Sequence, residues 1–241
     1  VAGDGLTEEL ESLDDELVYF STAVASAPSS VMSCASMLTG LPAYYIARNY
    51  EHYKYDNEEF FSIQRYLGEI GYEIRSNFVA REMREKYGHI LPLIDPRYHP
   101  EGLSENNHIP DVGYAWSNNT LSSILEKYLV QRNRDMPLFL LNWYNIRMDP
   151  TTSEEVERGI NILKSNGYWE NSIFLLLSDH GYIDPVRGYT PEKLKSQGLT
   201  HDLILTDDNI RIPFYLKYPG YKPQKIDSMV STYDILPTIV E

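Results

Sequence analysis

The sequence predicts an α/β protein with a mostly parallel central sheet and helices on both of its faces. Short apolar runs alternate with longer amphipathic segments, which is typical of strand–helix–strand units. The clearest run covers residues 173–177, where apolar side chains follow one another without interruption. Such a strand is expected to be buried on both faces, as strands are in parallel sheets covered by helices. The 241 residues are enough for one large α/β domain or two small ones, and a single domain over residues 1–241 is expected.

The composition argues against two classes of partner. Lysine and arginine total 21 against 35 aspartate and glutamate residues, a net charge of -14, and so acidic a chain repels nucleic acid. No apolar run approaches the roughly 18 residues that span a bilayer, so no membrane segment is expected in this chain. Cys34 is the only cysteine, which rules out an intrachain disulfide. An acidic protein that acts on anionic esters would need a cation or placed basic side chains.

The N-terminal part predicts a helix, a strand and a second helix. Leucines at helical spacing, with acidic residues between them, predict an amphipathic helix before a strand at residues 18–20: Leu6, Leu10, Leu13 and Leu17. Residues 33–39 can form the second helix, which Gly40 would end. Ser29 and Ser30 then lie close to a helix N-terminus, which favours anions. Alternatively, these serines are plain helix caps.

The middle of the chain continues the alternation around one long loop. Asn57 is expected to cap a helix through Glu69, followed by a strand at residues 72–75. Residues 78–87 predict another helix, whereas the prolines of residues 88–119 predict a long irregular loop. The histidines of this loop are irregularly spaced, so they are interpreted as solvated side chains: His89, His99 and His108.

The second half resumes a regular series. Helix 121–131, strand 138–143, helix 153–166 and strand 173–177 are followed by a loop over residues 181–208, strand 212–218 and a helix from Tyr233 that Thr232 caps. A right-handed crossover places the carboxyl ends of successive parallel strands at one sheet edge. Asn145 and Arg147 are therefore expected near Asp179.

Asp179, His180 and Gly181 directly follow the apolar strand. In open α/β sheets, ligands bind at the carboxyl ends of strands, and an aspartate beside a histidine can hold a metal ion. Alternatively, this stretch is a surface loop in which Asp179 caps the next turn and His180 is solvated. The pair is thus a candidate metal site.

Four segments, in order along the chain, carry a known pattern. Residues 10–20 look like a helix and strand that approach a nucleophile, and Ala35-Ser-Met-Leu-Thr-Gly40 is similar to the Ala-Ser-Leu-Leu-Thr-Gly that follows it. Ser178-Asp-His-Gly181 is similar to a metal-binding Asp-His/Asn-Gly. Residues 201–213 are similar to His-Gly-x-x-Leu-Tyr-Asp-Glu-x-x-Arg-Val-Pro. Together these segments resemble the sulfatase family of the alkaline-phosphatase superfamily.

The resemblance implies an α/β catalytic domain that cleaves esters through a covalent intermediate, with one divalent cation, Ca, Mg, Mn or Zn. Counting back from Gly40 places the nucleophile at Ser30, and the resemblance implies that Asp179 and His180 hold the cation. It also implies that His201 protonates the leaving group. Where the family has Asp-Pro-His, this chain has Asn145-Ile-Arg147, so Asn145 and Arg147 are expected to bind the anionic group of the substrate.

Two departures from the family pattern affect the chemistry. The family makes a formylglycine from the first residue of Cys/Ser-x-Pro/Ala-x-Arg, but Ser30 is followed by Val31, Met32, Ser33 and Cys34. Formylglycine is therefore not expected, and Ser30 is interpreted as an unmodified serine. Cys34, a helical turn further on, is expected to be a packed residue. The family's first strand, with two metal-binding aspartates, has no counterpart and is expected upstream of Val1, so the chain is interpreted as a fragment.

These observations predict a metal-dependent hydrolase of phosphate or sulfate esters that acts on a small-molecule or glycan anionic ester. A sulfate on serine lacks the hemiacetal collapse that formylglycine provides, which favours phosphate esters. The alternatives are a phospho-group transferase of the same superfamily and a non-catalytic member that binds anions or other proteins.

Overall fold

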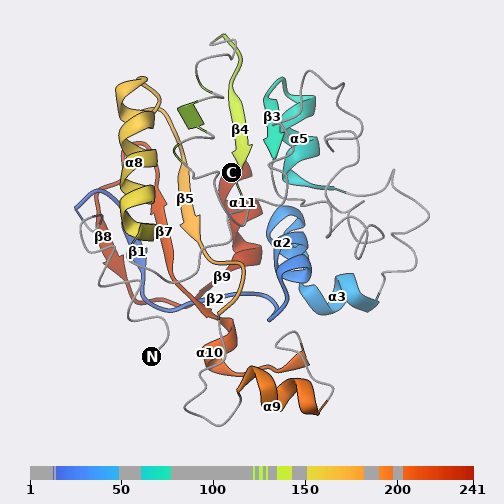
Figure 1. The fold of residues 1–241 in the computed structure, drawn as a ribbon. Coiled ribbons are helices and arrows are strands. Elements are labelled where there is room, and N and C mark those ends of the chain that lie inside the picture. The colour runs from blue at the N-terminus through green and yellow to red at the C-terminus, as the bar shows by residue number, and fades with distance from the viewer. Residues whose placement is uncertain are drawn as a thin grey trace. The chain divides into compact units, whose positions relative to one another are not determined.

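The computed structural model describes residues 13, 15–48, 61–76, 122, 125–126, 129, 135–142, 151–181, 190–197 and 203–241. The chain divides into two compact units. Unit 1 combines Val1–Ala47 with Glu170–Glu241, and unit 2 is Arg48–Trp169. The single domain expected from the sequence stays a prediction. Each unit is described by itself below (Figure 1).

A four-stranded sheet in the order β5-β7-β1-β8 forms the centre of unit 1. Its strands are β1 (Val18–Phe20), β5 (Phe174–Leu177), β7 (Phe214–Lys217) and β8 (Gln224–Ile226). β1 pairs parallel with β8, whereas β7 runs antiparallel to both β1 and β5. The predicted α/β class is confirmed, but this sheet is mixed rather than mostly parallel, because β7 runs antiparallel to both of its neighbours.

A three-stranded sheet, β6-β2-β9, continues unit 1. It contains β2 (Ala23–Val24), β6 (Arg211–Ile212) and β9 (Val230–Ser231). The strand predicted at residues 212–218 is therefore two strands, β6 and β7, with Pro213 between them. Proline has no N–H for a strand ladder, so the pairing is interrupted there.

The helices of unit 1 begin and end with clear local signals. They are α2 (Ser30–Thr39), α3 (Ala43–Arg48), α9 (Pro191–Ser196), α10 (Asp207–Ile210), the 3-10 helix η7 (Thr232–Asp234) and α11 (Ile235–Val240). α2 begins earlier than predicted, after Ser29 in an extended conformation, and ends at Gly40 as predicted. Ser231, not Thr232, caps η7: its N–H bonds to the Asp234 carboxylate in a capping box.

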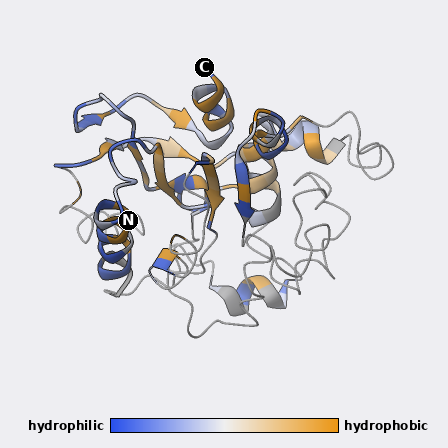
Figure 2. Ribbon diagram, turned by 90° about the horizontal axis from the view of Figure 1, so that it is seen from above, coloured by the Kyte–Doolittle hydropathy of each residue, from blue (hydrophilic) through white to orange (hydrophobic). Residues whose placement is uncertain are grey.

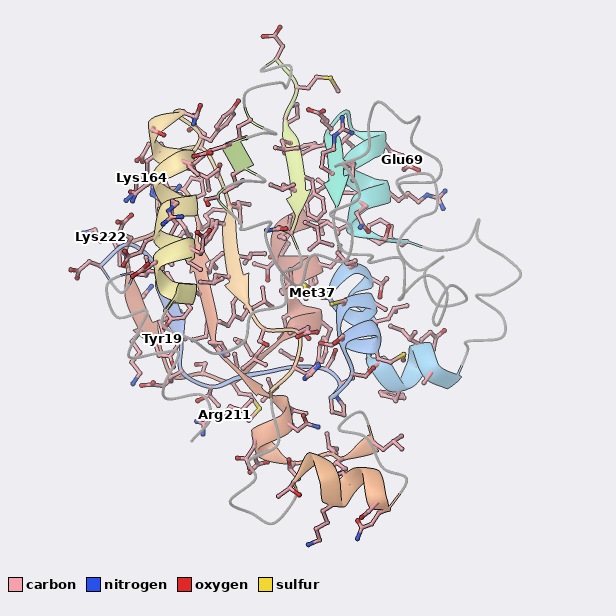
Figure 3. All side chains as sticks on the ribbon, in the orientation of Figure 1. Tyr19, Met37, Glu69, Lys164, Arg211 and Lys222 are labelled. Atoms are coloured by element: carbon pink, nitrogen blue, oxygen red, sulfur yellow. The ribbon has the colours of Figure 1, made fainter. Side chains whose placement is uncertain are left out.

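The core of unit 1 lies where the sheets meet α2 and α11. Ala23, Ala25, Ile212, Phe214 and Ile235 are buried together, and Met37 of α2, labelled in Figure 3, packs against them. Figure 2 shows hydrophobic strand segments beside hydrophilic ones. The residues of β5 are half-buried and Ile173 is 40% exposed, so the predicted burial on both faces is wrong for this unit. The reason is that β5 is an edge strand of the described sheet.

Unit 2 contains α5 (Ile63–Glu69), α8 (Thr151–Ser165) and the parallel pair β3 (Glu73–Ser76) and β4 (Leu138–Leu141). These bounds confirm the predicted strands and the helix of residues 153–166. Ser62 caps α5 by accepting from the N–H of Arg65 at 3.2 Å. The predicted cap, Asn57, lies outside the described residues.

Several predicted segments cannot be compared with the structure. Most of the first helix, the helix at residues 78–87 and the loop at residues 88–119 lie outside the described residues. Residues 122, 125–126 and 129 are helical, as expected for the helix at residues 121–131. In the part of the chain that is described, no helix combines the length and apolar character needed to cross a membrane.

Candidate functional site

Two segments that lie far apart in the sequence meet in unit 1. Ser30, the first residue of α2, presents its Oγ 3.1 Å from Nε2 of His180, which follows β5. The separation of 150 positions between these residues means that the fold, not the local chain, brings them together. A hydroxyl at a helix N-terminus thus lies against a histidine at the carboxyl end of a strand.

The segment before Ser30 is held by hydrogen bonds of Ala25 and Ser26. The N–H of Ser26 donates to Oγ1 of Thr232 at 3.0 Å, and that hydroxyl donates to Oγ of Ser26 at 3.2 Å. The N–H of Ala25 donates to the carbonyl of Ile210 at 2.7 Å. Ser29 is the N-cap residue, but its side chain makes no capping hydrogen bond. The hydroxyl of Ser30 is directed to His180 instead.

The hydrogen bonds of His180 define which ring nitrogen carries the proton. Nδ1 lies 2.6 Å from the carbonyl oxygen of Gly181. Because a carbonyl can only accept, Nδ1 carries the hydrogen in the neutral ring, and this tautomer is assigned from the hydrogen-bond partners. Nε2 is then the acceptor for the hydroxyl of Ser30. The lone pair of Nε2 therefore points into the site.

Asp179 contributes one oxygen to the loop and one to the site. Its Oδ1 accepts from the N–H of His180 at 3.0 Å, as the capping alternative expects. Its Oδ2 lies 3.8 Å from Nε2 of His180, and the two side chains are only 17% and 15% exposed. The alternative of a surface loop with a solvated His180 does not describe this arrangement, because the side chains of Asp179 and His180 are largely buried and face each other.

Cys34 lies one helical turn after Ser30 and is buried, as predicted. Burial, reinforced by the nearby negative charge of Asp179, raises the pKa of the Cys34 thiol well above its ordinary value of 9.0. A neutral thiol is a weak nucleophile. Ser30 is therefore the better placed nucleophile on α2.

The donor atoms of this site have the spacing of ligands that share a cation. Two ligands about 2.1 Å from one ion, at angles of roughly 95–130°, lie about 3.1–3.8 Å apart. Nε2 of His180 lies 3.1 Å from Oγ of Ser30 and 3.8 Å from Oδ2 of Asp179. Within the described residues, no three His, Cys, Asp or Glu side chains cluster at metal-binding distances. The two separations are therefore compatible with ligands of one cation, of which Asp179 and His180 would supply part of the set.

The remaining site residues predicted from the sequence lie outside the described residues: Asn145, Arg147 and His201. β4 and β5 belong to different units, so the expected crossover between them also stays a prediction. Sequence reasoning missed the carbonyl of Gly181 and the bond between Ser26 and Thr232. No sequence signal marks such contacts, because every residue has a carbonyl and serine and threonine are common.

Comparison with known proteins gives a family match. Residues 151–241 match the family model of the sulfatases. An ulvan-active sulfatase of Formosa agariphila is 29% identical over 92 residues, which are 37% of this chain and 16% of that relative. The residues matched by the family model include the Asp179-His180 segment but not Ser30.

Solved structures of the alkaline phosphatase superfamily share the fold. The lipoteichoic acid synthase LtaP of Listeria monocytogenes has a TM-score of 0.66 and 17% identity, over 98% of this chain and 65% of LtaP. An alkaline phosphatase superfamily protein of Vibrio parahaemolyticus has a TM-score of 0.61 and 17% identity, over 96% of this chain and 59% of that chain. The phosphonate monoester hydrolase of Silicibacter pomeroyi has a TM-score of 0.58 and 12% identity, over 97% and 67%. At these identities, the likeness establishes the fold alone.

Proposed function

From the match of residues 151–241 to the sulfatase family model and the similarity to an ulvan-active sulfatase, we propose that the whole protein is a sulfatase-family enzyme that hydrolyses phosphate or sulfate esters at the site of Ser30 and His180. The observation that carries this proposal is the 3.1 Å contact between Oγ of Ser30 and Nε2 of His180. This contact lies at a helix N-terminus, where backbone N–H groups can bind an anion.

Ser30 is the proposed nucleophile. The hydroxyl of Ser30 loses its proton to solvent water, and Oγ attacks the phosphorus or sulfur atom while the bond to the leaving oxygen breaks. The product is a phosphate or sulfate ester on Ser30 that water then cleaves. The N-terminal N–H groups of α2 stabilise negative charge that develops on the transferred group. The helix thus positions the nucleophile and binds the anion.

Asp179 and His180 are the residues that would hold one divalent cation, which would polarise the ester and make the hydroxyl of Ser30 more acidic. The hydrogen bond from Nδ1 of His180 to Gly181 keeps Nε2 unprotonated and directed into the site. The carboxylate of Asp179 keeps Oδ2 directed to the same point, because its Oδ1 is held by the N–H of residue 180.

The resemblance supports roles for three further residues. His201 is proposed to protonate the leaving group, because histidine exchanges protons near neutral pH. Arg147 and Asn145 are proposed to bind the non-bridging oxygens of the substrate, because guanidinium and amide groups donate hydrogen bonds to such oxygens. The substrate is proposed to be a small-molecule or glycan ester.

Phosphate esters are the preferred substrate class. Ser30 lacks the proline and arginine that accompany formylglycine formation in the family, so the intermediate is an ordinary serine ester. A sulfate on serine has no aldehyde through which it can collapse, whereas phosphoserine intermediates are cleaved by water. A phosphoserine intermediate can also transfer its phospho group to an alcohol instead of water.

Hydrolysis of p-nitrophenyl phosphate and p-nitrophenyl sulfate by the whole protein, with Ca, Mg, Mn or Zn added back after chelation, tests the proposal. We expect faster turnover of the phosphate, and a loss of about 10³-fold or more in Ser30→Ala. Ser29→Ala is the matched control, because the side chain of Ser29 makes no capping hydrogen bond. Added glycerol separates hydrolase from transferase, since a transferase would form glycerol phosphate.

Acid quench during turnover should trap a phosphoseryl adduct on the peptide that contains Ser30. An aldehyde-reactive hydrazide should not label that peptide. Labelling would instead restore formylglycine chemistry and a sulfate substrate. Absence of turnover with every metal, while anions still bind, would favour the non-catalytic alternative.

A further inference from the structure

One short turn is bonded to both segments that form the site. The carbonyl of Asn209 in α10 accepts from the N–H of Gly181 at 2.9 Å, and the carbonyl of the next residue, Ile210, accepts from the N–H of Ala25 at 2.7 Å. Ala25 leads into the turn before Ser30, and Gly181 follows His180. Adjacent carbonyls of α10 therefore link the nucleophile segment to the histidine segment.

Gly181 lies so close to this turn that a side chain has no room. A Cβ at this position would lie 2.1 Å from the carbonyl oxygen of Asp208 and 2.8 Å from that of Arg211. Gly181 is not among the glycines with positive φ, so close approach, not an unusual backbone angle, explains the glycine. The peptide whose carbonyl accepts the hydrogen bond from Nδ1 of His180 is thus fixed by the backbone of residues 208–211.

The turn itself depends on the side chain of Asn209. α10 has only four residues, and the side chain of its N-cap, Thr206, makes no capping hydrogen bond. Asn209 is fully buried. Its Nδ2 donates to the carbonyl of Ile204 at 2.7 Å, and its N–H donates to the carbonyl of Thr206 at 3.0 Å. The amide therefore ties α10 to the chain that precedes it.

We infer that Asn209 is a positioning residue, which holds α10 against Gly181 and Ala25 and so directs Nε2 of His180 toward Oγ of Ser30. It acts through Gly181: the N–H of Gly181 binds α10, and its carbonyl binds Nδ1 of His180. Only the kinetic consequence of this inference rests on the proposed function. The orientation of the ring is a property of the chain itself.

The tautomer of His180 tests the inference without turnover. In ¹⁵N-labelled, chelator-treated protein at about pH 8.5, where an ordinary histidine is neutral, we expect the proton of His180 on Nδ1 in the wild type. The signal is assigned by its loss in His180→Gln. In Asn209→Ala we expect a mixture of tautomers, because the carbonyl of Gly181 is no longer fixed.

Asn166→Ala is the matched control. Nδ2 of Asn166 donates to the carbonyl of Ile162 at 2.8 Å, so this variant loses the same kind of hydrogen bond in unit 2. We expect the His180 tautomer of Asn166→Ala to equal that of the wild type. An effect on both variants would indicate a general loss of stability and overturn the inference.

Kinetics give the second measurement. We expect kcat of Asn209→Ala to fall about 10–100-fold, as for other groups that orient a histidine ligand, with KM changed less than about 2-fold. If Asn209→Ala does not fold, Asn209→Ser takes its place, and amide exchange of Gly181 in the wild type must show protection. A proton on Nε2 in the wild type, or a wild-type tautomer in a folded Asn209 variant, overturns the inference. If no ester is turned over, the proposed function fails, whereas the tautomer still decides the role of Asn209.

Discussion

At the scale of single residues, the site combines a hydroxyl, an imidazole and a carboxylate whose directions are set by backbone groups. The N–H of residue 180 holds Asp179, and the carbonyl of Gly181 holds His180. Asp179 and His180 thus each keep one polar atom for the backbone and present the other to the site. Substitution of either side chain should therefore lower ester turnover much more than it lowers the free energy of unfolding.

Asp179→Ala should remove nearly all activity while changing the free energy of unfolding by less than about 1 kcal/mol. The structural loss includes the hydrogen bond from the backbone N–H of residue 180, worth about that amount, and removal of a charge near a metal-free site offsets part of it. Asp179→Asn is the matched variant, because its amide oxygen can still accept from the N–H of residue 180. Urea unfolding in chelator, beside ester turnover, measures both effects. A loss of several kcal/mol in Asp179→Ala but not in Asp179→Asn would instead assign Asp179 a purely structural role as a cap.

Cys34 gives a pH dependence with a definite sign. Burial and the charge of Asp179 raise the pKa of its thiol in the folded protein. The stability that this group contributes is complete below the unfolded value near 9.0 and is lost as pH rises above it. The free energy of unfolding of the wild type should therefore fall relative to Cys34→Ala above that pH, by up to about 1.4 kcal/mol per pH unit. Denaturant curves of both proteins from neutral to alkaline pH measure this difference. Parallel curves would contradict it.

At the scale of elements, the sequence predicts those boundaries that depend on one strongly placed residue. Gly40 ends α2 with φ of 66° as expected, and the apolar run before Asp179 forms β5. Boundaries with several competing signals were not predictable: serines cap α5 and η7 where other residues were expected. Pro213 divides the predicted strand at residues 212–218 into β6 and β7. The proline is a strand-breaking residue, but the apolar residues on both sides of it favoured one continuous strand.

Gly40 also permits close packing, which yields a prediction about α2. A Cβ on Gly40 would lie 3.0 Å from Cδ2 of Leu236 in α11, in addition to its φ of 66°. Gly220 has φ of 83°, and a Cβ there would meet no neighbouring atom within 4 Å. Gly220→Ala should therefore cost only the strain of a left-handed residue, about 1 kcal/mol. Gly40→Ala should cost that amount and about 1 kcal/mol more, because the contact between α2 and α11 must shift.

Urea unfolding of the two glycine variants measures this difference. Both are in unit 1, so the same cooperative transition is compared. Equal losses would show that Leu236 can move aside at little cost and that α11 does not restrain the C-terminal end of α2.

At the scale of the whole molecule, the fold brings Ser30 and His180 together, whereas the sequence shows only that each lies in a family-like segment. Counting back from Gly40 predicted a role for Ser30, and the position after a strand predicted one for His180. Their 3.1 Å contact, however, depends on the folding together of residues 150 positions apart. The contributions of Gly181 and Asn209 could not be predicted, because they arise from backbone atoms of a turn that approaches the site only in the folded chain. The chain spans 65% of LtaP and 16% of the ulvan-active sulfatase, so tests of activity belong to the whole protein.

Metal binding should stabilise the whole protein through the atoms of this site. A ligand that binds only the folded state at 100 times its dissociation constant adds about 2.7 kcal/mol to the free energy of unfolding. We expect a gain of this size with at least one of Ca, Mg, Mn and Zn. The gain should be lost in Asp179→Ala and in His180→Gln, because each variant removes a donor from the partial ligand set.

Ser29→Ala should keep the full gain, since the side chain of Ser29 makes no capping hydrogen bond and is not among the three donors. Thermal unfolding with a titration of each metal, together with the metal content of the purified protein, measures the effect. Equal stabilisation of wild type, Asp179→Ala and His180→Gln would place the cation elsewhere, and no stabilisation by any of the four metals would remove it from the proposed chemistry.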